Sequence, residues 1–257
     1  MIRRLAGSIV EDHGEWLVVR TPAIPTFWWG NFLLFAHALR PGDAIDWERR
    51  FVAQFPGAKH RAYGIDGTGG EVGDTAEVAT LGVVPDVSVV LTASALRPPP
   101  SSASSTATRR LCCDRDWAEA LRLRQACDDQ PDSDGQRLFR QHKLEEARSL
   151  TEQGHGAWFG TFEADQMVCG LGIFSDGSGV ARYQSVETHP AHRRRGLARR
   201  LVHEASVYAT TELAATTLVI VADPGYHAID LYRSLGFRDQ EKQLQLARPP
   251  GAALVDS

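Results

Sequence analysis

The sequence has 257 residues, of which 43% are hydrophobic, and this is enough for one large domain or two small ones. The formal charge of −4 and the pI of about 6.1 exclude a bulk electrostatic attraction to nucleic acid or to a membrane surface. No apolar run reaches the ~18 residues that a membrane span needs, and the first residues lack the apolar core of a signal peptide. We therefore expect a cytoplasmic protein with neither a nucleic-acid nor a membrane partner.

The first 96 residues predict a small α+β domain. Residues 15–20 alternate like a strand, residues 26–35 are strongly aromatic and apolar, and residues 47–55 have helical spacing. Residues 78–84 and 87–92 resemble a closing hairpin, although a helix, a glycine and a strand also fit this part of the sequence.

Residues 97–107 are rich in proline and serine and cannot build a core, so they predict a linker. The linker separates the domain at 1–96 from a larger domain at 108–248, which is followed by a tail at 249–257.

The larger domain alternates between strand and helix patterns. Strand patterns occupy residues 109–111, 157–162, 167–174, 180–188, 217–222 and a closing stretch at 242–247. Helix patterns occupy residues 116–126, 138–151, 197–213 and 228–235.

A glycine-containing basic turn joins the strand pattern at 180–188 to the helix pattern at 197–213. Residues 192–198 read H-R-R-R-G-L-A. Glycine lets a ligand come close to the backbone, and a helix N-terminus adds partial positive charge. Arginine can grip phosphate oxygens in a bidentate way. The turn therefore predicts a phosphate-bearing ligand, and the alternative is a basic helix start on the surface.

Two motifs together resemble the GNAT superfamily of acyl-CoA-dependent N-acetyltransferases. The phosphate loop of that family, Q/R-x-x-G-x-G/A, is matched at residues 193–198, and its last helix, A-x-x-L-Y-x-x-x-G-F, is matched at residues 228–237. The resemblance covers about residues 108–248. It implies an α/β (α+β) fold with a mixed, mostly antiparallel sheet flanked by helices, in the order β-α-α-β-β-β-α-β-α, preceded here by the smaller α+β domain.

The resemblance implies that acetyl-CoA is a co-substrate and that a small-molecule or peptide amine is the acceptor. Backbone groups of Val186 and Thr188 would bind the pantetheine arm, and an N–H near Val186 would polarise the thioester carbonyl. The residues expected to bind the cofactor are Val186, Thr188, Arg193, Arg194, Arg195, Gly196, Leu197, Ala198 and Ala228.

In this picture the amine attacks directly, and no covalent enzyme intermediate forms. Tyr232 matches the family's position for the acid that protonates the leaving thiolate; the alternative is a core tyrosine. Glu187 lies beside the reaction point and is a candidate base; the alternative is that it pairs with a nearby arginine. His189 and His192 are expected to shape the anion turn.

The sequence departs from the family pattern at Gly225, where many relatives carry asparagine. This departure keeps a second function open, a non-catalytic acyl-CoA-binding or sensing module. The cluster Arg193–Arg195 is the only feature that points to nucleic acid. The acidic segment at 128–135 fits either a site that attracts a cationic amine or a solvated loop.

Two further questions concern metals and the first domain. The cysteines lack zinc-ligand spacing, so we expect buried or strand thiols and no metal. The domain at 1–96 is either a degenerate GNAT-like domain that has lost its cofactor turn or an unrelated α+β domain that covers the acceptor side. The oligomeric state does not follow from the sequence.

Overall fold

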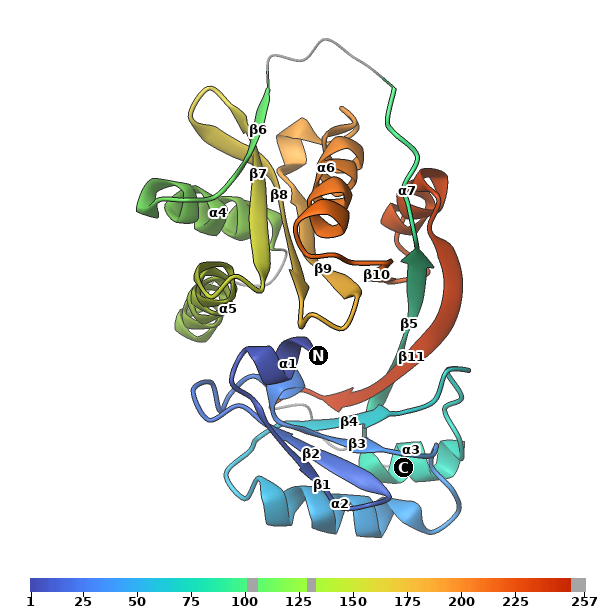
Figure 1. Cartoon of the computed structure of the whole chain (residues 1–257). Coiled ribbons are helices and arrows are strands. Elements are labelled where there is room, and N and C mark those ends of the chain that lie inside the picture. The colour runs from blue at the N-terminus through green and yellow to red at the C-terminus, as the bar shows by residue number, and fades with distance from the viewer. Residues whose placement is uncertain (101–105, 129–132, 251–257) are drawn as a thin grey trace. The chain divides into compact units, whose positions relative to one another are not determined.

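The computed structural model describes residues 1–100, 106–128 and 133–250 (Figure 1). Parts of the predicted linker, of the acidic segment and of the predicted tail therefore lie outside the described residues. Contacts divide the chain into two compact units. The larger unit contains Met1–Ala6, Leu91–Val221 and His227–Asp239; the smaller unit contains Gly7–Val90, Ala222–Tyr226 and the residues from Gln240 onward.

This division differs in detail from the predicted limits of 1–96 and 108–248. The first six residues fold with the second half of the chain, because Ile2 of the short helix α1 (Ile2–Leu5) is buried in the core of the larger unit. The predicted closing strand at 242–247 lies in β11 (Arg238–Arg248), whose residues Leu244–Arg248 pair with the first half of the chain.

The smaller unit is built on a mixed sheet. The strands β1 (Ile9–Asp12), β2 (Trp16–Arg20) and β3 (Phe32–Phe35) pair antiparallel, and β3 then pairs in parallel with β4 (Arg61–Ile65). Leu244–Arg248 of β11 pair antiparallel with β4.

The core of the smaller unit depends on the helix α2 (Asp43–Gln54). Its Trp47 stacks on Phe35 at 3.7 Å between ring centroids, and its Phe51 contacts Tyr63 edge-on. These aromatic side chains are at most 2% exposed. The helical spacing predicted for residues 47–55 is confirmed up to Gln54, where the helix ends.

The hairpin predicted at residues 78–84 and 87–92 is wrong. Residues 75–81 form the helix α3 (Thr75–Leu81), because the Asp74 side chain caps it by accepting hydrogen bonds from the backbone N–H groups of Ala76 and Glu77. Gly82 ends this helix, and β5 (Val84–Ala93) follows. The helix, glycine and strand that the sequence also allowed are therefore found.

The larger unit contains a sheet in the order β10-β9-β8-β7-β6, in which only the β9–β10 pair is parallel. Its strands are β6 (Ala107–Arg110), β7 (Gly156–Glu163), β8 (Gln166–Ser175), β9 (Val180–Thr188) and β10 (Thr217–Ala222). Its longer helices are α4 (Asp114–Cys127), α5 (Asp134–Glu152), α6 (Leu197–Thr211) and α7 (Ala228–Leu235). The predicted order β-α-α-β-β-β-α-β-α is confirmed from β6 to α7.

Helices cover both faces of this sheet. The strand β8 is buried along nearly its whole length on both faces, and it contacts α4 and α5 as well as α6 (Figure 1). The core on the α4 and α5 face includes Trp117, Leu123, Leu144 and Trp158. The buried sheet fixes the position of β9, whose far end carries the candidate site.

Replacement of Phe51 with alanine tests the core of the smaller unit. Because Phe51 is 0% exposed, Phe51→Ala should lower the free energy of unfolding by about 3–5 kcal/mol. The next residue provides a control, since Val52 is 42% exposed and Val52→Ala should change the free energy by about 0.5 kcal/mol or less. Urea unfolding measures both; equal losses in the two variants would contradict this core.

Candidate functional site

The pairing between β9 and β10 stops part of the way along β9. Val180, Ala181 and Arg182 pair with Thr217–Val219, whereas the described residues give the rest of β9 a registered strand partner only on the β8 side. Backbone N–H and C=O groups need hydrogen-bond partners. The free edge of β9 is therefore suited to binding an extended ligand, in the place where the sequence predicted Val186 and Thr188 to act.

A β-bulge lies in this part of β9, which is paired with β8 only. Gln184 is opposite Gly172 and Glu187 is opposite Gly170, so that two residues, Ser185 and Val186, face a single residue of β8. Ser185 has a φ of +49°, in the left-handed region that non-glycine residues rarely adopt. Bulges re-aim side chains and concentrate beside functional sites. The bulge is therefore an independent sign that this end of β9 has a functional role.

The basic turn leads directly from β9 into α6. It begins with the short helix η2 (Pro190–His192), where the His189 ring accepts a hydrogen bond from Ala191 N. Arg194 and Gly196 have φ values of +62° and +75°, and Gly196 stands at the N-cap position of α6 without a side-chain cap. Backbone in which left-handed residues alternate with other residues can turn successive N–H groups toward one point, and such a concavity suits an anion.

The arginines of the turn lie in different environments. Arg193 Nε donates to the carbonyl oxygen of Thr188 at 3.3 Å, which joins the turn to the end of β9. Arg195 forms two hydrogen bonds to Glu163, at 2.9 and 3.0 Å, and His192 lies 3.0 Å from the same carboxylate. Arg194 is exposed. The backbone of the turn, rather than a cluster of free arginines, is thus the feature best suited to an anion.

Tyr232 lies on the buried face of α7. It is 6% exposed, between the buried residues Ile229 and Leu235, and its ring packs edge-on against Phe237. Ala228 is the first residue of the same helix, and Gly236 ends it as predicted. The burial of Tyr232 fits both readings of this residue, the proton donor and the core tyrosine. Gly225 lies before α7 in an exposed turn, where its N–H donates to Asp223.

Glu187 follows the bulge and forms an ion pair. Its Oε1 accepts a hydrogen bond from Arg124 Nε of α4 at 3.1 Å. Burial raises the pKa of Glu187, and the charge of Arg124 opposes this effect only in part. The arginine partner considered in the sequence alternative is therefore present, and the raised pKa also makes Glu187 a stronger base.

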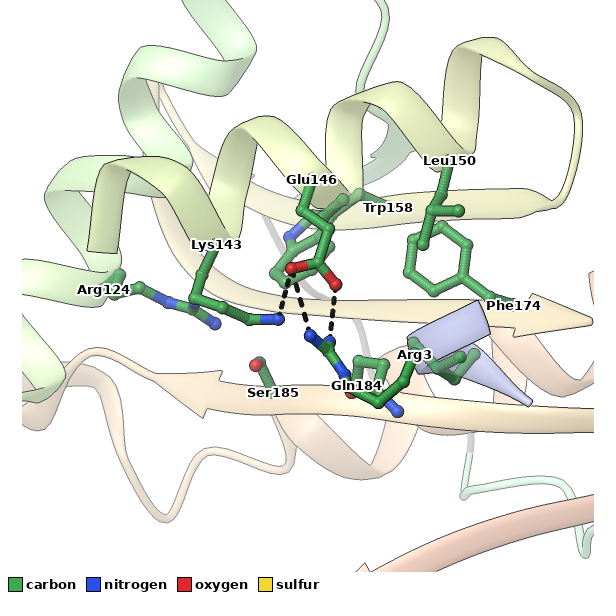
Figure 2. A pocket seen from close by; sticks show the side chains of 11 residues that line it. Arg3, Arg124, Lys143, Glu146, Leu150, Trp158, Phe174, Gln184 and Ser185 are labelled. Atoms are coloured by element: carbon green, nitrogen blue, oxygen red, sulfur yellow. Dashed lines mark hydrogen bonds and ion pairs between the residues drawn. The ribbon is translucent and has the colours of Figure 1, made fainter. Parts of the chain in front are cut away.

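A small pocket, with ≈20 Å³ of free space, lies beside the bulge, within the larger unit (Figure 2). Gln184 and Ser185 of β9 form one wall, Lys143 and Glu146 of α5 lie across from them, and Arg3 extends from beside Gln184 to Glu146. Further lining residues are Ile2, Arg124, Ala147, Leu150, Trp158 and Phe174. The pocket thus reaches along β9 as far as Ser185, the residue before Val186.

Sequence reasoning missed the charged residues of this pocket, although two of them left a signal. Lys143 precedes Ala147 and Leu150 at helical spacing, so it occupies an apolar-stripe position of α5. On α4, Arg124 follows Trp117 and Ala120 at helical spacing and so also occupies an apolar-stripe position. A charge on an apolar stripe indicates a polar pocket. No pattern in the sequence could assign Arg3 to this place.

The cysteines do not all lie where the sequence suggested. Cys169 is buried in β8 and Cys127 is half-buried, but Cys112 and Cys113 are exposed and precede α4, outside any strand. The expectation of buried or strand thiols is therefore wrong for this pair, because the chain leaves β6 at Arg110. Asp116, whose carboxylate lies within 4.8 Å of both thiols, is paired with Arg109.

Residues 117–237 match the model of the acetyltransferase (GNAT) family. These residues run from within α4 to the end of α7 and include the bulge in β9 and the basic turn. This part of the chain is therefore a GNAT acetyltransferase domain.

Solved structures share the fold of nearly the whole chain. A GCN5-related N-acetyltransferase from Kribbella flavida is 16% identical, with a TM-score of 0.65 over 98% of this chain and 96% of that one. A functionally unknown conserved protein from Staphylococcus epidermidis is 13% identical, with a TM-score of 0.71 over 95% and 94%. A tandem GNAT protein from the clavulanic acid biosynthesis pathway is 11% identical, with a TM-score of 0.57 over 98% and 88%.

No curated protein matches the sequence. Among the described residues, none of the helices has the length and apolar character needed to cross a lipid bilayer.

Substitution of Gly196 tests the anion turn. Gly196→Glu should weaken CoA binding by about tenfold or more, because it places a carboxylate where the N–H groups attract an anion. Gly177→Glu is the matched control, since Gly177 also has a positive φ and open space around its Cα. Calorimetric titration with CoA measures both, and unchanged affinity in Gly196→Glu would place the phosphate site elsewhere.

Proposed function

We propose that this protein transfers an acetyl group from acetyl-CoA to a primary amine. The observation that carries the proposal is the part of β9 beyond Arg182, which has no registered partner on the β10 side among the described residues and contains the bulge at Ser185. The basic turn connects this part of β9 to the uncapped N-terminus of α6. A thioester with a long, amide-containing arm and a pyrophosphate has the two features that this arrangement fits. The arm would add to the free edge of β9 at Val186 and Thr188, and the turn from Arg193 to Ala198 would hold the phosphates.

In the proposed reaction the amine nitrogen attacks the acetyl carbonyl carbon while a backbone N–H near Val186 stabilises the developing oxyanion. The C–N bond forms, the C–S bond breaks, and the acetyl group leaves the sulfur. The attacking nitrogen loses a proton to Glu187, directly or through water. The departing thiolate takes a proton from the Tyr232 hydroxyl. Transfer is direct, so no residue of the chain becomes acetylated.

A second proposal concerns the origin of the smaller unit. We infer that it is a degenerate GNAT-like domain, which the whole-chain likeness to a tandem GNAT protein supports at the level of fold. The helix α3, ended by Gly82 and followed by β5, repeats the arrangement of α7, Gly236 and β11.

Tyr232→Phe tests the proposed acid. This variant keeps the ring and its packing but removes the hydroxyl, so turnover should fall by about tenfold or more while CoA affinity stays the same. Tyr208→Phe on α6 is the control and should leave turnover unchanged. The rate of thiol release from acetyl-CoA is the measurement. Unchanged turnover in Tyr232→Phe would make Tyr232 a core residue only.

Glu187→Gln tests the proposed base. Because burial raises the pKa of Glu187 above its usual 4.5, the acid limb of the pH–rate profile should lie above that value. The rate is full above this pKa and is lost as the pH falls through it. In Glu187→Gln the rate should fall and the acid limb should disappear. Burial also raises the pKa of Glu204, so Glu204→Gln serves as a control that keeps the limb. An unaltered limb in Glu187→Gln would exclude the base role.

A further inference from the structure

The pocket beside the bulge has an excess of positive charge. Arg3, Arg124 and Lys143 line it, whereas Glu146 is the only carboxylate among the described lining residues (Figure 2). Glu146 forms ion pairs with two of these cations: its Oε1 lies 2.5 Å from Arg3 Nη2, and its Oε2 lies 2.8 Å from Lys143 Nζ. With Glu187, which pairs with Arg124, two carboxylates face three cations.

A fourth cation strengthens the excess. Arg182 is largely buried in β9, and its charge and that of Arg3 repel each other, so that burial and Arg3 together lower the pKa of Arg182. Its Nε has no hydrogen-bond partner among the described residues. Burial and the charge of Arg3 likewise lower the pKa of Lys143 to about 8, although Glu146 opposes them. Among the described side chains, the carboxylates of Glu146 and Glu187 thus stand against the four cations Arg3, Arg124, Lys143 and Arg182.

The pocket suits a small anion whose other end reaches the reaction point. Its free space of ≈20 Å³ is small, so the pocket suits one small polar group, such as a single carboxylate, rather than a whole ligand. Figure 2 shows the Ser185 hydroxyl turned toward the pocket, and Ser185 is the bulge residue directly before Val186. Trp158, Leu150 and Phe174 supply an apolar wall. A group bound here lies next to Val186, near which a backbone N–H is proposed to polarise the thioester carbonyl.

We propose that this pocket binds the carboxylate of the acceptor and that the acceptor is a free amino acid. The proposal rests on the proposed function, because it names the acceptor of that reaction. A free α-amino acid carries its amine one carbon from its carboxylate, so a short pocket beside the bulge can hold the carboxylate while the amine reaches the thioester. A lysine side chain or a peptide N-terminus lacks a carboxylate at that distance.

Equilibrium binding tests the proposal without requiring turnover. The full-length protein, saturated with CoA, is titrated with the common L-amino acids and with their carboxamides, which lack only the carboxylate charge. At least one amino acid should bind about tenfold more tightly than its amide. Lys143→Gln should remove this preference and Lys143→Arg should keep it. Arg148→Gln is the control on the same helix, because Arg148 pairs with Asp114 and Glu152, outside the pocket.

The outcomes separate this proposal from the proposed function. If an amino acid binds in a Lys143-dependent way but acetyl-CoA releases no thiol in its presence, the carboxylate pocket stands and acetyl transfer to that acceptor fails. If acetyl-CoA releases thiol equally with an acid and its amide, acetyl transfer stands and the carboxylate pocket is wrong. Binding of none of these compounds would also overturn the proposal. Arg3→Gln provides a second variant with the same expected loss should Lys143→Gln not fold.

Discussion

The site depends on the place where β9 loses contact with β10. Three residue pairs join these parallel strands, and beyond Arg182 the chain continues without a strand on that side in the described structure. A strand edge inside a domain is normally paired or covered, because its polar groups otherwise lack partners. Here the edge is kept open, and a bulge at Ser185 disturbs the other edge as well. Both features are costly in a purely structural strand and useful in one that binds an extended ligand.

The turn after β9 connects this open strand edge to the N-terminus of α6. Gly196 provides the left-handed backbone from which α6 can begin with its N–H groups uncovered. Arg193 fastens the turn to the end of the open strand through the Thr188 carbonyl, and Glu163 of β7 fixes Arg195. The open strand edge and the helix N-terminus are therefore held as one preformed unit. Preorganisation of this kind reduces the ordering entropy that binding must overcome.

Local patterns predicted much of this arrangement. The alternation at β9 and β10 gave both strands with their observed limits, and the R-x-x-G-x-A turn and the Tyr232 helix lie where their motifs indicated. Local patterns failed where distant residues decide. The pairing of Leu244–Arg248 with β4 joins residues about 180 positions apart in sequence, and Arg3 reaches Glu146 across a similarly long stretch of chain. The hairpin predicted at residues 78–84 and 87–92 is wrong for a local reason, because Asp74 caps the helix α3 over the first of these segments.

Arg124 connects the two halves of the proposed chemistry. It pairs with Glu187, the candidate base, and it lines the pocket proposed for a carboxylate. All of this follows only if the open edge of β9 and the turn bind acetyl-CoA. The most direct test is calorimetric titration of the full-length protein with acetyl-CoA and, separately, with CoA. We predict micromolar binding of both; the absence of binding by either would contradict the assignment of β9 and the turn as the cofactor site.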